Sequence, residues 1–79
     1  MNIQLIQGDF NHQEGLDIIS KMIQLKISYH ESKISSNTNE EDIKFRESKI
    51  KRLQSDLMQL RSALQGNDNL HIESNINIE

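Results

Sequence analysis

The feature that most constrains the fold is a pair of apolar stripes within one segment, residues 12–34. At about 100° per residue, the apolar side chains of this segment fall into two groups on a helical wheel. The first group is Leu16, Ile19, Ile23, Ile27 and Ile34, with His30 in line; the second is Ile18, Met22, Leu25 and Tyr29. One neighbouring helix covers one stripe. The other needs a further cover, because monomers rarely leave a contiguous apolar patch in water.

The flanking residues define two helices. Asn11 followed by Glu14 has the form of an N-cap with an acidic third position, and no proline follows, so we predict a helix over 12–34. Thr38 and Glu41 have the spacing of a capping box, which predicts a second helix over 39–65. Gly66 is the expected left-handed terminator of that helix.

The second helix carries one apolar face at coiled-coil spacing. Its members are Ile43, Ile50, Leu53, Leu57, Leu60 and Leu64. Arg46 stands where this pattern calls for another apolar residue. Because the connection between the helices is only a few residues long, we expect them to run antiparallel as a hairpin.

Both ends of the chain have the period of two that is typical of strands. In residues 1–8, Ile3 and Leu5 alternate and Ile6 follows, before a turn expected at Gly8 and Asp9. In residues 69–78 every second side chain from Leu70 to Ile78 is apolar except Ser74. An antiparallel helix pair brings the two strands out together, so they are expected to pair antiparallel, within one chain or between two copies. A disordered polar tail is the alternative for residues 69–78.

The fold class expected is therefore mainly α, a single helical-hairpin domain over 1–79 with the order β-α-α-β. A chain of 79 residues with 34% hydrophobic residues has a small core. We predict that two hairpins close as a homodimeric four-helix bundle. The predicted dimer interface is the second stripe: Ile18, Met22, Leu25 and Tyr29. The alternatives are that the strands fold back over this stripe or that an unrelated protein covers it.

The residues that could carry chemistry are few. Without cysteine there is no disulfide, thiolate nucleophile or thiolate zinc site, and the three glycines form no phosphate-binding motif. His30 has no carboxylate at helical spacing on its own face, so a structural histidine at the helix seam is expected. Helix capping accounts for Asp9 and His12. We expect no enzyme, no metal and no cofactor.

A cluster of cations on the second helix gives the alternative function, weak RNA or DNA binding. The candidate contacts are Lys44, Lys49, Lys51 and Arg52. Acidic residues interrupt the cluster, no aromatic side chain accompanies it on the polar side of the helix for base stacking, and the net charge is −3. No segment approaches the roughly 20 apolar residues of a membrane span, and no leader is evident, so a cytoplasmic protein is expected. The favoured function is a non-catalytic protein-protein interaction or scaffolding module whose partner the sequence does not name.

Overall fold

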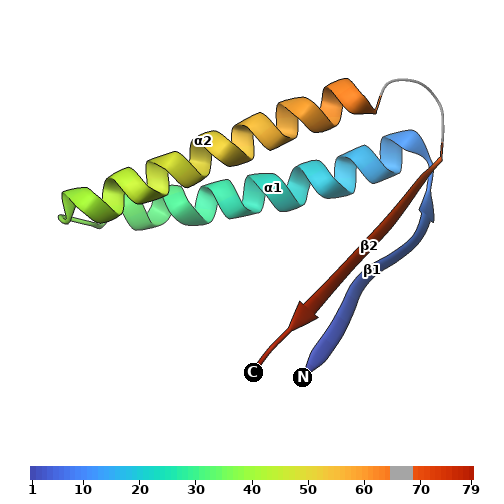
Figure 1. Cartoon of the computed structure of the whole chain (residues 1–79), viewed down its shortest axis with the longest axis horizontal. Helices are drawn as coiled ribbons and strands as arrows, with labels where there is room; N and C mark the ends of the chain where they lie inside the picture. Colours follow the sequence, from blue (N-terminus) through green and yellow to red (C-terminus); the bar gives the residue numbers. More distant parts are fainter. Residues whose placement is uncertain (65–68) are drawn as a thin grey trace.

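The computed structural model describes residues 1–64 and 69–79. The elements are β1 (Asn2–Phe10), α1 (His12–Ser35), α2 (Glu40–Ala63) and β2 (Leu70–Asn77). This confirms the order β-α-α-β, with the helices side by side and β1 paired antiparallel with β2 in the same chain (Figure 1). Residues 70–77 form a strand, so the alternative of a polar tail is wrong.

The predicted N-cap of α1 is confirmed and that of α2 is displaced by one residue. Asn11 Oδ1 accepts a hydrogen bond from the Glu14 backbone N–H at 2.8 Å. In α2 the capping residue is Asn39, not Thr38, because Asn39 Oδ1 accepts from the N–H groups of Glu41 and Asp42 at 2.9 and 3.2 Å. These are the second and third N–H groups of the helix, the ones that a capping side chain reaches.

The helix ends differ slightly from the predicted ones. α1 extends one residue further, to Ser35, and α2 ends at Ala63. The Leu64 N–H closes α2 with a hydrogen bond of 3.0 Å to the Leu60 carbonyl oxygen. The predicted end at Gln65 and the terminator Gly66 lie outside the described residues.

The course of β1 corrects two predictions. The chain does not turn at Gly8 and Asp9: Gly8 has φ 144°, which glycine tolerates, and the strand continues to Phe10. The register shifts between Gln4 and Ile6, so Leu5 is an extra residue in a bulge. The expected alternation of Ile3 with Leu5 is therefore wrong.

The bulge gives the sheet one apolar face. Ile3 lies opposite Ile76 and Ile6 opposite Ser74, and directly paired residues share a face. We call this side the apolar sheet face; by the same register it carries Ile3, Ile6, Phe10, Leu70, Ile72 and Ile76. The opposite face is polar. The bulge thus places Ile3 and Ile6, three positions apart in the sequence, on the same side.

The sheet joins the helices at one close contact. A Cβ on Gly15 of α1 would lie 2.6 Å from Leu70 Cδ1 and 3.3 Å from Ile72 Cδ1, so any side chain at this position must displace the ends of these two side chains. From this joint the sheet diverges from α1, as Figure 1 shows. The molecule measures 45 × 33 × 13 Å, close to a single layer of secondary structure. Among the residues described, no hydrophobic side chain is buried.

Substitution of Gly15 tests the joint. Gly15→Leu keeps α1 helical, because leucine favours helix, but forces β2 away from α1 at an overpacking cost of about 1–3 kcal/mol. We expect faster amide exchange throughout β1 and β2 with unchanged helix content by circular dichroism. Gln13→Leu, at an exposed position of the same turn, is the control and should leave exchange unchanged. Equal protection of the strands in both variants would contradict the joint.

Candidate interaction surfaces

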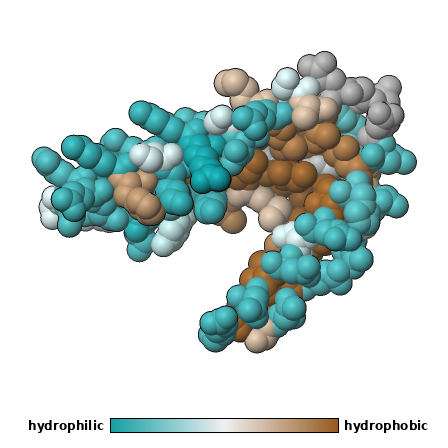
Figure 2. Space-filling view, viewed as in Figure 1, coloured by the Kyte–Doolittle hydropathy of each residue, from teal (hydrophilic) through white to brown (hydrophobic). Residues whose placement is uncertain are grey.

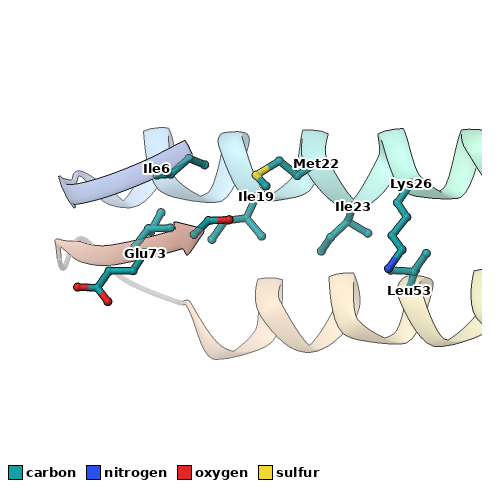
Figure 3. Close-up of a pocket in the computed structure, with 9 residues that line it drawn as sticks. Ile6, Ile19, Met22, Ile23, Lys26, Leu53 and Glu73 are labelled. Atoms are coloured by element: carbon teal, nitrogen blue, oxygen red, sulfur yellow. The ribbon is translucent and has the colours of Figure 1, made fainter. Parts of the chain in front are cut away.

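An apolar cleft of about 380 Å³ opens between the helices and the sheet. Its apolar lining is Ile6, Ile19, Met22, Ile23, Leu53 and Ile72. Lys26 and Glu73 lie at its margin; in Figure 3, Lys26 extends from α1 toward Leu53 of α2, and the Glu73 carboxylate points away from α1. Hydrophobic side chains gather in the angle between the helices and the sheet and continue along the sheet (Figure 2). The cleft exists because the sheet leaves α1 at Gly15.

The structure divides the predicted dimer stripe. Met22 lies in the cleft and is 38% exposed, whereas Leu25 and Tyr29 lie outside it and are 74% and 52% exposed; Ile18 is half-buried. Two exposed apolar side chains of α2, Phe45 and Met58, were not singled out from the sequence, because they fall outside its seam. The role of the stripe as an interface remains a prediction.

A second groove, between α1 and α2, is basic. It is lined by Lys26, Lys49, Arg52, Leu53 and Asp56, with a volume of about 260 Å³. Of the predicted nucleic-acid contacts, Lys49 and Arg52 come together here; Lys44 and Lys51 are not in the lining. Lys26 was missed, although its place between the two stripes of α1 was the signal that it faces a groove. Lys49 also lies over the exposed Phe45 ring, with Nζ 5.2 Å from the ring centre, so the expectation that no aromatic side chain accompanies the cations is wrong.

A buried polar pair interrupts the seam between the helices. His30 is only 8% exposed, and its Nδ1 lies 3.1 Å from a terminal guanidinium nitrogen of Arg46. Because a guanidinium only donates, Nδ1 accepts and the ring proton is on Nε2. Arg46 Nε also donates to Asp42 Oδ2 at 3.1 Å. His30 is thus a buried histidine that is hydrogen-bonded at the helix seam, and Arg46, which stands in place of an apolar residue there, is its partner.

Removal of one partner of this pair should destabilise the hairpin more than removal of both. Arg46→Leu leaves Nδ1 of the buried His30 without its donor, and we expect the free energy of unfolding to fall by about 1–3 kcal/mol. The double variant His30→Leu/Arg46→Leu should regain most of that loss, because an apolar pair fits the seam. Urea unfolding measures both values, with the exposed Lys44→Leu as control. A double variant less stable than Arg46→Leu would contradict the pairing.

A second imidazole bridges the two strands on the polar face of the sheet. His71 Nδ1 lies 2.9 Å from Asp9 Oδ1 on β1, and Nε2 lies 3.0 Å from Glu73 Oε1. The hydrogen bond to Glu73, followed by that to Asp9, raises the pKa of His71 above its ordinary 6.5. Asp9 is thus a cross-strand partner, and its assignment to helix capping is wrong. The sequence spacing gave no signal, because Asp9 and His71 meet only through the strand register.

The bridge predicts that the sheet is more stable in mild acid. Both ring nitrogens donate only in the protonated imidazole. Since the folded pKa lies above 6.5, the contribution is complete below pH 6.5 and is lost as the pH rises through the raised value. We expect a higher free energy of unfolding at about pH 6 than at about pH 8.5. His71→Gln should lose this difference, and His12→Gln should keep it. A pH dependence that survives in His71→Gln would exclude the bridge as its source.

Neither described helix has the length and apolar content needed to cross a bilayer. Across residues 1–64 and 69–79, no three histidine, aspartate or glutamate side chains are grouped so that they could hold a metal ion. Comparison of the chain with protein-family models, with curated proteins and with solved structures gave no match.

Proposed function

We propose that this protein is a non-catalytic interaction or scaffolding module that acts as a homodimer, with two helical hairpins closed as a four-helix bundle. The observation that carries the proposal is the lack of any buried hydrophobic side chain in the described part of the chain. Folded domains ordinarily consist of at least two packed layers around a core. A second copy supplies the missing layer.

The exposed area supports association on this scale. The chain exposes 6206 Å², whereas a compact monomer of 9.2 kDa exposes about 4,900 Å². The excess, about 1,300 Å², exceeds the roughly 800 Å² that each partner buries in a standard interface. Burial of this excess in a dimer leaves each chain with the exposed area of a compact monomer of its own mass.

The proposed interface is the second stripe of α1. Leu25 and Tyr29 are both more than half exposed, and Met22 and Ile18 extend the stripe toward the start of the helix. In a bundle these side chains pack between the two hairpins, as apolar stripes of four-helix bundles do. The sheet edges and the remaining helix surfaces of the dimer then offer sites for a partner protein by strand addition or helix packing.

The alternative function is weak RNA or DNA binding through the basic groove. Lys26, Lys49 and Arg52 supply three cations there against one carboxylate, Asp56. The interaction module is favoured because the net charge of the chain is −3 and the apolar surface needs a cover, which phosphate contacts do not provide.

Leu25→Lys tests the dimer. Leu25 is 74% exposed in the single chain, so its replacement costs little stability in a monomer, but it places a charge in the proposed interface. We expect the dissociation constant to rise at least tenfold, measured by sedimentation velocity over a concentration series. Gln24→Lys, an exposed neighbour with the same charge change, should dimerise like the wild type. A compact wild-type species of one-chain mass at every concentration would refute the proposal.

A further inference from the structure

The apolar sheet face is half-buried near the helices and exposed at its far end in the single chain. Near the joint, Ile72 and Leu70 lie close to Gly15 of α1. Farther along, Ile76 is 38% exposed and Ile78 is 49% exposed. The sheet diverges from α1 in this direction (Figure 1), so the helices of the same chain do not cover its far end. A two-stranded sheet is marginally stable by itself and needs packing on one face.

The apolar cleft between the sheet and the helices, called the wedge below, therefore has two apolar sides that no other part of the described chain fills. Ile6 and Ile72 line it from the sheet, and Ile19, Met22 and Ile23 line it from α1. The same chain also carries an exposed apolar helix stripe that includes Leu25 and Tyr29. A helix with one apolar stripe is the element that fills a groove of this kind.

Met22 connects the two surfaces. It lines the cleft and also belongs to the stripe of α1. In a twofold dimer one patch meets itself, so a residue shared by two complementary surfaces lies near the axis. A twofold axis near Met22 brings the stripe of each chain to the cleft of the other.

We infer that α1 of a second copy occupies the wedge, so that the far end of the apolar sheet face covers Leu25 and Tyr29 of the partner subunit. This inference rests on the proposed homodimer and adds the sheet as a second contact of the interface. Each chain gives one wedge and one stripe, and a twofold arrangement uses both of each pair and closes with two copies. It also uses the exposed area of both the sheet and the helices, in keeping with an excess of about 1,300 Å² per chain.

Ile76→Lys tests the contribution of the sheet. If the sheet of one chain packs on α1 of the other, this change should raise the dissociation constant of the dimer at least tenfold, measured by sedimentation velocity. Asn75→Lys, next to it on the polar face, adds the same charge and should dimerise like the wild type. Helix content and strand amide exchange of Ile76→Lys, measured at equal concentration, separate loss of the contact from loss of the sheet.

A cross-link gives a readout that does not depend on loss of function. The chain has no cysteine, so Ile76→Cys and Leu25→Cys each carry a single thiol. An equimolar mixture, treated with a short bis-maleimide, should give the mixed dimer at least tenfold faster than a mixture of Ile76→Cys with Lys51→Cys, whose thiol lies on an exposed position of α2.

The outcomes separate the two proposals. If Leu25→Lys weakens the dimer, Ile76→Lys does not and no preferential cross-link forms, the contact between the sheet and α1 of the partner is excluded. The four-helix bundle then remains as the proposal. A wild-type chain that remains monomeric overturns both proposals. A weaker dimer of Ile76→Lys together with the preferential cross-link supports the contact between the sheet and α1 of the partner.

Discussion

The close contact at Gly15 is the point at which β2 packs against α1. Because a hydrogen replaces a side chain there, β2 approaches α1 at one point, with Leu70 and Ile72 against the helix. Beyond that point the sheet and the helices separate, and the chain stays close to one layer thick. A single layer cannot enclose a core, which is why no hydrophobic side chain of the described residues is buried. The open cleft between the sheet and α1 is a consequence of that geometry.

Directed polar contacts hold the layer together where apolar burial is weak. Asn11 and Asn39 cap the two helices, the pair of His30 and Arg46 aligns them across the seam, and His71 ties β2 to β1. Hydrogen bonds fix register more than they contribute free energy, since each exchanges a bond to water for a bond to protein. A chain built in this way has defined geometry and a small margin of stability. Association is therefore an effective source of further stability, since binding to the folded chain stabilises it by mass action.

Much of the fold could be predicted from the sequence, because its signals are local. The period of the apolar residues, the cap at Asn11 and the alternation from Leu70 to Ile76 each depend on a few adjacent positions. The failures have equally specific causes. Thr38 and Asn39 are both good N-cap residues. The turn at Asn37, whose Oδ1 accepts a hydrogen bond from the Asn39 N–H at 2.8 Å, favours Asn39. The bulge at Leu5 broke the assumed period of β1. The prediction of the basic groove lacked Lys26, and the bridge at His71 was not predicted. In both cases the members come from different elements.

The sequence by itself determined the type and order of the elements, the amphipathic character of each and the excess of apolar surface on α1, because these depend on side-chain spacing along one backbone. Only the tertiary structure decided where those surfaces lie. It placed Ile3 and Ile6 on one face through the strand register, put Asp9 opposite His71, and moved Met22 into a cleft shared by the sheet and α1. Such contacts join residues far apart in the chain, and their distances are set by how the elements pack, which no local pattern records.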